Sequence, residues 1–169
     1  MTSAGTLRIE STKPSFSKGP TEVNTRMVFG SFGTYQPYVA LKQKIGYQYA
    51  LKASLNGTFS KGDYPFELRN GSATTLEKRI NSDVRSYGAE TDFYADWSSR
   101  GRLKAKINLH SSERGLPGSV ILYTQNAYER LWDRSLLSNL MYDCNLGNRW
   151  KVHADAGFTG SFNRHLDTD

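Results

Sequence analysis

The fold of this chain is decided by two stretches, RLKAKINLH at residues 102–110 and RWKVHADAGFTGSFNR at residues 149–164. In the first stretch, apolar residues hold the odd positions from Leu103 to Leu109, and Lys, Asn and His hold the even positions between them. In the second, the even positions from Trp150 to Phe158 carry no charge, and their odd-numbered neighbours are polar or Gly. A two-residue period is typical of a strand with one apolar face and one water-facing face. Both stretches therefore predict strands of a sheet.

The same alternation recurs along the rest of the chain. It predicts strands at residues 6–12, 22–32, 37–43, 49–61, 83–97, 102–110, 128–145 and 149–164. Part of 128–145 also fits helical spacing, and we assign it as a strand because its neighbours need an antiparallel partner. Two long polar connections, 62–82 and 111–127, show no convincing periodicity. The predicted fold class is all-β, an antiparallel up-and-down meander.

Composition excludes some classes of protein. No run in the 169 residues approaches the ~18 consecutive apolar residues of a membrane-spanning helix, whereas the strands of a membrane barrel remain compatible with 37% hydrophobic residues. The net charge of +6 is spread through the strands rather than clustered, which disfavours nucleic acid as a partner. Cys144 is the single cysteine, so no internal disulfide is expected. Met1–Thr6 lacks a secretory signal, and we expect an internal piece of a longer exported protein rather than a cytoplasmic one.

The connections differ in length in a regular way. From the 49–61 strand onward they run long, short, long, short, which places long loops at one end of a meander and short turns at the other. That asymmetry is typical of outer-membrane barrels. Trp97, Trp150 and Tyr47 lie beside the short turns, where an interfacial aromatic girdle is expected. The sequence therefore predicts a partial transmembrane β-barrel.

Two short motifs add a resemblance to a known family. AGTLRIESTKP at residues 4–14 resembles the end of the plug domain of TonB-dependent outer-membrane receptors, and GSFGTY at residues 30–35 resembles the tip between their first two barrel strands. The resemblance implies an end of plug and connection at 1–20, then the N-terminal part of the barrel at 21–169, with about seven barrel strands after a short plug-end strand. SERGLPG at 112–118 and RLWD at 130–133 resemble receptors of Bacteroidetes-type bacteria, some of them similar to cobalamin transporters.

The family resemblance implies a function and a location. A complete receptor has a 22-stranded barrel with an N-terminal plug and lies in the outer membrane of a Gram-negative bacterium, where it imports a large nutrient such as a corrinoid, siderophore or glycan. Its implied partners are the TonB complex, outer-membrane lipid and a surface lipoprotein. This chain lacks the TonB box, most of the plug and the remaining barrel strands, so we interpret it as a fragment.

Candidate functional residues are few. No catalytic constellation stands out, and we expect no enzyme activity, cofactor or metal; the three histidines and the pair Glu90 and Asp92 are interpreted as water-facing. Arg114, Leu116 and Tyr123 in the 111–127 loop are the candidate substrate contacts. A set of basic residues on the polar faces either guides an anionic substrate or is ordinary water-facing charge: Lys52, Lys104, Lys106, Lys151 and Arg26.

A soluble antiparallel β-sandwich that binds a ligand through its long loops is the alternative function class. A barrel exposes the apolar faces of its strands to lipid, whereas a sandwich buries them against a second sheet. The environment of residues such as Leu55 and Ile107 discriminates between the two.

Overall fold

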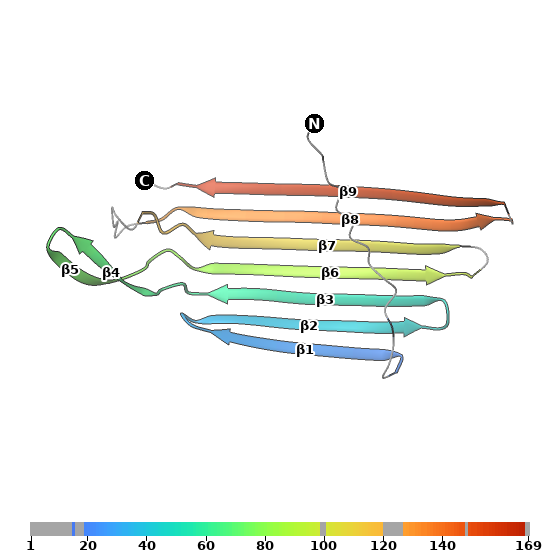
Figure 1. Cartoon of the computed structure of the whole chain (residues 1–169), viewed down its shortest axis with the longest axis horizontal. Coiled ribbons are helices and arrows are strands. Elements are labelled where there is room, and N and C mark those ends of the chain that lie inside the picture. Colours follow the sequence, from blue (N-terminus) through green and yellow to red (C-terminus); the bar gives the residue numbers. More distant parts are fainter. Residues whose placement is uncertain (1–14, 16–18, 99–100, 120–126, 148, 168–169) are drawn as a thin grey trace, which may run out of the picture.

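The computed structural model describes residues 15, 19–98, 101–119, 127–147 and 149–167. Its main body is one seven-stranded sheet with the strand order β1-β2-β3-β6-β7-β8-β9 (Figure 1). The strands are β1 (Thr21–Gly30), β2 (Thr34–Ile45), β3 (Tyr49–Ser60), β6 (Val84–Asp96), β7 (Arg102–Gly115), β8 (Arg130–Leu146) and β9 (Trp150–Leu166). A separate hairpin is formed by β4 (Pro65–Asn70) and β5 (Ala73–Lys78).

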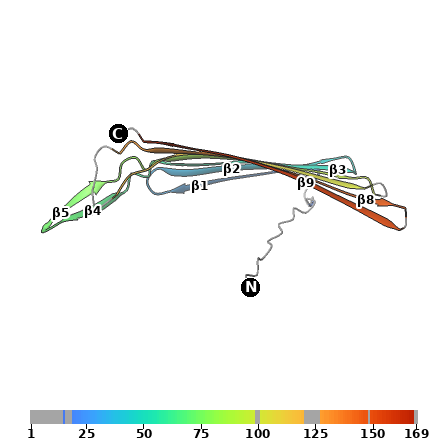
Figure 2. The same cartoon turned by 90° about the horizontal axis from the view of Figure 1, so that it is seen from above.

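Each strand of the large sheet pairs antiparallel with the strand that follows it in that sheet, from β1 with β2 through to β8 with β9. Seen from the side, the sheet is a single layer, and the β4–β5 hairpin projects beyond one of its ends (Figure 2). The predicted all-β antiparallel meander is confirmed. All seven predicted strands from residue 22 onward are present, and the predicted 6–12 strand lies outside the described residues.

Two predictions about the long connections are wrong. The 62–82 connection, expected to lack strands, contains β4 and β5, which pair from Pro65 opposite Lys78 to Asn70 opposite Ala73. Strand β7 continues five residues past its predicted end at His110, because residues 111–115 keep their pairing with both β6 and β8.

The connections lie as predicted with one exception. The β3–β6 and β7–β8 connections are long and share one end of the sheet, and the β2–β3 turn lies at the other. The short β1–β2 turn, however, lies at the long-loop end, where the Lys61 backbone N–H donates to the Phe32 carbonyl at 3.1 Å. The expectation that every short turn lies opposite the long loops is therefore wrong. Phe32 and Gly33 both have positive φ, as a tight hairpin turn requires.

The sheet lacks the core of an ordinary domain. Among the described residues, the buried apolar residues are Ala40, Ala50, Tyr94 and Ala95, and no large side chain is fully buried. A sheet must normally bury one face against another layer, and the described part of this chain supplies none. Among the described strands, the two edge strands β1 and β9 each pair on one side only.

Candidate functional site

The pairing register sorts the side chains of the large sheet into two faces. The apolar face carries the odd positions of β1, β2, β3, β6 and β7 and the even positions of β8 and β9. The polar face carries the remaining positions. The faces predicted from sequence for β3, β6, β7 and β9 are confirmed by this register, since Leu51, Phe93 and Ala105 are successive cross-strand partners.

An uncharged band crosses the apolar face. One of its cross-strand rows consists of Leu51, Phe93, Ala105, Leu140 and Ala156. Large apolar side chains within the band are open to the surroundings, with exposures of 59% for Leu55, 47% for Ile107 and 59% for Phe158. A continuous exposed apolar surface of this kind marks contact with another protein or with a membrane.

Aromatic side chains border the uncharged band at both ends. At the long-loop end the Tyr35 and Phe59 rings stack with centroids 4.7 Å apart, and Phe59 meets Tyr87 edge-on at 5.3 Å. At the turn end the Trp97 indole N–H donates to the Tyr49 hydroxyl at 3.2 Å. Trp150, 74% exposed, lies at the same turn end on β9. Tyr and Trp rings prefer such positions where an apolar region meets water.

A four-residue charge cluster lies on the polar face across β3, β6 and β7. Lys52 Nζ lies 3.3 Å from Glu90 Oε1 and 3.6 Å from Asp92 Oδ2. Lys106 Nζ lies 3.2 Å from Glu90 Oε2 and 3.8 Å from Asp92 Oδ1. The two lysines flank the two carboxylates because Lys52 and Lys106 are the cross-strand partners of Asp92 on either side. Asp92 is only 2% exposed, so this carboxylate depends on its lysines for compensation.

A depression of the polar face adjoins the charge cluster. Its lining combines both carboxylates with amide, phenol and ammonium groups: Glu90, Asp92, Tyr94, Lys104, Ala105, Lys106, Asn108, Leu137, Asn139 and Met141. The Asn108 side-chain amide lies 3.5 Å from Glu90 Oε2 as a donor. These groups can hydrogen-bond a polar ligand. The charges of the cluster balance, so it supplies no net attraction for an anion.

A second ionic cluster joins three strand ends at the long-loop end of the sheet. The Arg130 guanidinium donates to both oxygens of Asp83, at 2.7 Å from Nη1 to Oδ1 and 3.0 Å from Nη2 to Oδ2. Its Nη2 also donates to Glu113 Oε1 at 2.6 Å. Asn81 adds two hydrogen bonds from its side-chain nitrogen, to the Leu116 carbonyl at 3.0 Å and to the Glu129 carbonyl at 2.8 Å. Arg130 and Asn81 therefore fix where the two long connections leave the sheet.

Close packing at Gly115 reinforces this junction. A Cβ at Gly115 would clash with the Asn81 carbonyl oxygen, so only glycine permits this approach of the two chains. The Gly115 backbone N–H donates to the Asp83 carbonyl at 2.9 Å, and the Leu116 N–H to the Glu129 carbonyl at 3.0 Å.

Arg79 ties the β4–β5 hairpin to the next long connection. It is 6% exposed, it donates from Nη2 to the Gly118 carbonyl, and its guanidinium lies 5.9 Å from the centre of the Phe66 ring. Arg79 was not singled out by sequence reasoning, because the strand that precedes it was not predicted.

Two of the three predicted substrate contacts, Arg114 and Leu116, lie within the described residues. Arg114 lies on β7 rather than in a loop, and its Nη2 makes an ion pair with Asp133 Oδ2 at 3.3 Å. Leu116 directly follows β7, in the junction held by Asn81. Tyr123 lies outside the described residues. The structure thus corrects the loop assignment of Arg114 and replaces it with a strand-end position.

The predicted basic lining is only partly free to act on a ligand. Lys52 and Lys106 belong to the charge cluster, and the Arg26 guanidinium lies 5.4 Å from the Tyr38 ring centre. The interpretation of Asp92 as water-facing is wrong, because flanking lysines and neighbouring strands cover it.

Two histidines of the described ranges lie beside carboxylates. His153 Nδ1 pairs with Asp143 Oδ1 at 2.8 Å, and His165 Nε2 lies 3.4 Å from Glu129 Oε2. In that part of the chain no three His, Cys, Asp or Glu side chains gather closely enough to hold a metal ion. The same part of the chain contains no helix long and apolar enough to cross a membrane.

Comparisons with known proteins add no family: no protein-family model matches the sequence, and no curated protein matches it.

Proposed function

We propose that this chain forms part of the wall of a transmembrane β-barrel, with its apolar face toward lipid and its polar face toward the lumen. The observation that carries the proposal is the exposed uncharged band with aromatic side chains along both of its borders. Lipid-facing surfaces of outer-membrane barrels have this composition, with an apolar band about 25 Å tall between two aromatic girdles.

The depth of the band supports the proposal. On β8 the uncharged positions of the apolar face run from Leu136 to Leu146. At ~3.3 Å per residue this span is roughly 33 Å of strand. A strand tilted by about 45° converts that length into a height of roughly 23 Å. The value agrees with the hydrocarbon region that a barrel strand must cross.

The absence of a core also supports a membrane location. A water-soluble chain with this much apolar surface on one face would be prone to association. Lipid removes the need for a second layer, because acyl chains cover the apolar face directly. The rival β-sandwich requires a second sheet over Leu55 and Ile107, and the described strands form one layer with those side chains exposed.

We further propose that the barrel belongs to a TonB-dependent outer-membrane receptor that binds and imports a large nutrient. This step rests on the motifs at 4–14 and 30–35 together with the meander and the long loops gathered at one end. In this proposal the long-loop end faces the exterior, and the Arg130 cluster holds the loops that meet the nutrient. The plug and the remaining strands come from the complete receptor, as does the partnership with TonB.

The face assignment is tested by labelling adjacent residues. Single cysteines replace Ile107 and Asn108 in the protein made from the complete reading frame, in a Cys144→Ala background, and each carries a nitroxide. We expect the Ile107→Cys label to be accessible to lipid-dissolved oxygen, and the Asn108→Cys label to a water-soluble nickel chelate. Equal contact of both labels with the nickel chelate, in a protein found outside the membrane fraction, contradicts the barrel.

The receptor step needs a separate experiment. Deletion of the complete gene should abolish growth on one limiting nutrient among a corrinoid, a siderophore and a glycan, and loss of TonB should have the same effect. A membrane-embedded protein whose deletion changes uptake of none of the three, and whose purified form binds none, contradicts the receptor and leaves the barrel standing.

A further inference from the structure

The charges of the apolar face are distributed unevenly between its two ends. Three exposed arginines lie at the long-loop end, beyond or within the aromatic border: Arg85, Arg134 and Arg164. The register places Arg134 opposite Ser111 and Phe162, one cross-strand row nearer the uncharged band than Arg85. No charged residue of the described strands occupies the apolar face at the turn end.

The carboxylates near these arginines are already engaged. Glu113 is the one acidic residue on this face of the described strands, and Arg130 binds it at 2.6 Å. Within the described ranges, neither Arg85 nor Arg134 has a carboxylate within ion-pair distance. The Arg164 guanidinium lies 5.3 Å from the centre of the Trp132 ring. Arg85 acts electrostatically on the Asp83 carboxylate, whereas Arg134 leaves the long-loop border with positive charge that no ion pair of the described strands balances.

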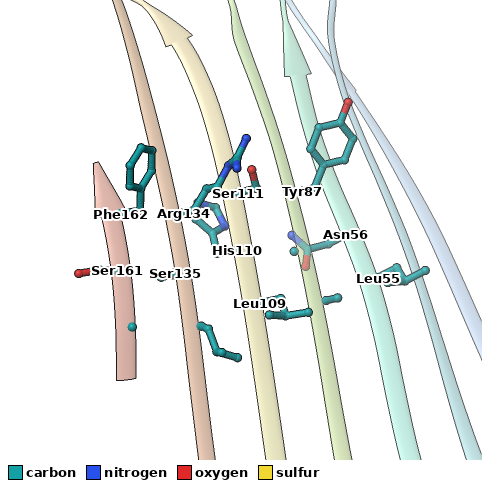
Figure 3. A pocket seen from close by; sticks show the side chains of 14 residues that line it. Leu55, Asn56, Tyr87, Leu109, His110, Ser111, Arg134, Ser135, Ser161 and Phe162 are labelled. Atoms are coloured by element: carbon teal, nitrogen blue, oxygen red, sulfur yellow. The ribbon is translucent and has the colours of Figure 1, made fainter. Parts of the chain in front are cut away.

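An apolar groove runs from Arg134 into the uncharged band (Figure 3). It is lined on the apolar face by Leu55, Leu109 and Leu136, and Arg134 lies between the rings of Tyr87 and Phe162 at its long-loop end. Gly160 and Ala89, with little or no side chain, leave the middle of the groove open. The groove therefore has space along its middle for an extended hydrocarbon chain.

We infer that this groove binds a phosphorylated lipid of the leaflet at the long-loop end, with an acyl chain along the groove and the phosphate on Arg134. This inference rests on the proposed barrel. Charge complementarity selects the occupant, because the groove is apolar along its length and cationic only at its head. The arginines at the long-loop end of the apolar face then suit a membrane whose outer leaflet carries more negative charge than its inner leaflet.

The test uses the protein from the complete reading frame, purified in detergent and mixed with lipid A, a phosphorylated acylated disaccharide, or with its dephosphorylated form. Native mass spectrometry counts the retained lipid. We expect Arg134→Gln to reduce retention of lipid A about fivefold, the factor for one arginine at an anionic lipid surface. The control Arg26→Gln removes an exposed cation from the polar face, and we expect no change in retention.

A second pair of variants tests the groove without changing charge. A Cβ at Gly160 would make only ordinary contact with Phe158, at 3.4 Å, so Gly160→Leu should be tolerated while it fills the groove and lowers retention. Gly157→Leu on the polar face of the same strand is the matched control. Equal retention by the original protein, Arg134→Gln and Gly160→Leu overturns the inference, as does equal retention of the dephosphorylated lipid. If the protein then still resides in the membrane fraction, the barrel proposal survives that result.

Discussion

Arg130 holds Asp83 through two parallel hydrogen bonds, from Nη1 to Oδ1 and from Nη2 to Oδ2, although the two residues lie 47 positions apart in the chain. The pair connects the start of β8 to the residue before β6, and Glu113 adds the end of β7 through the same guanidinium. Planar two-point pairing of this kind is stronger and more directional than a single contact. The geometry of the long-loop end therefore depends on one side chain.

We expect Arg130→Gln to loosen that end of the sheet. The backbone N–H groups of Gly115 and Leu116 should exchange with solvent deuterium faster, because the strand ends that hold them lose their common anchor. The cost should be about 1 to 2 kcal/mol, since the pair is partly exposed. Arg69→Gln, in a largely exposed pair with Glu67, serves as the control. Unchanged exchange at Gly115 and Leu116 argues against the anchor.

The same pair should make stability depend on pH. The hydrogen bonds from Arg130 hold the pKa of Asp83 below its ordinary value of 3.8. A carboxyl whose pKa falls on folding stabilises the protein above its unfolded-state pKa and loses that effect as pH drops through the folded-state value. The Tm difference between the original protein and Asp83→Asn should thus be constant above about pH 4 and shrink below it. A difference that stays constant down to acid unfolding would be contrary to this linkage.

Asp92 provides a test of the charge cluster. Asp92→Asn leaves Lys52 and Lys106 with Glu90 alone, and we expect a loss of about 1 to 3 kcal/mol in the free energy of unfolding, because both lysines are about one-third exposed. Adding Lys106→Gln should cost less than the sum of the single effects. Asp155→Asn is the control, since that exposed carboxylate bonds only Asn139 among the interactions described. Chemical unfolding in detergent measures the original protein, the two single variants, the double variant and the Asp155→Asn control.

The surface proposed to face lipid should show a depth dependence along β8. Leu140 lies in the middle of the uncharged band and Leu146 at its turn end, both on β8 and both exposed. We expect Leu140→Arg to cost about 2 to 4 kcal/mol and Leu146→Arg at most about 1 kcal/mol. Folding into lipid vesicles of defined thickness supplies the measurement. Similar small costs at the two positions would contradict a bilayer around this surface.

The apolar face could be predicted from sequence because apolar and polar residues alternate along the part of each strand that carries the uncharged band. The alternation stops where the band stops. Past His110 the residues Ser111 to Arg114 are all polar, so alternation ends while the pairing of β7 continues. The two-residue period therefore predicts the depth of the uncharged band, and it does not predict the full length of β7. This is also why Arg114 was assigned to a loop.

The sequence contains a local signal for the β4–β5 hairpin. Asn70 pairs with Ala73, so Gly71 and Ser72 form a two-residue turn, and Gly71 has the positive φ that such turns favour at this position. The charge cluster had no comparable signal. Lys52 and Glu90 meet only because of the register between β3 and β6, which the intervening connection sets and no local pattern records.

The strand order of the large sheet has a consequence for how it assembles. Every strand pairs with its successor in the sheet, so no segment must be threaded between strands already in place. Each strand hydrogen-bonds to the exposed edge of the strand before it. Only the loop that joins the two strands has to close at that step. Among the described strands β9 is an outer strand, so one further hairpin paired with its outer edge would widen the sheet by two strands and leave every earlier pairing intact.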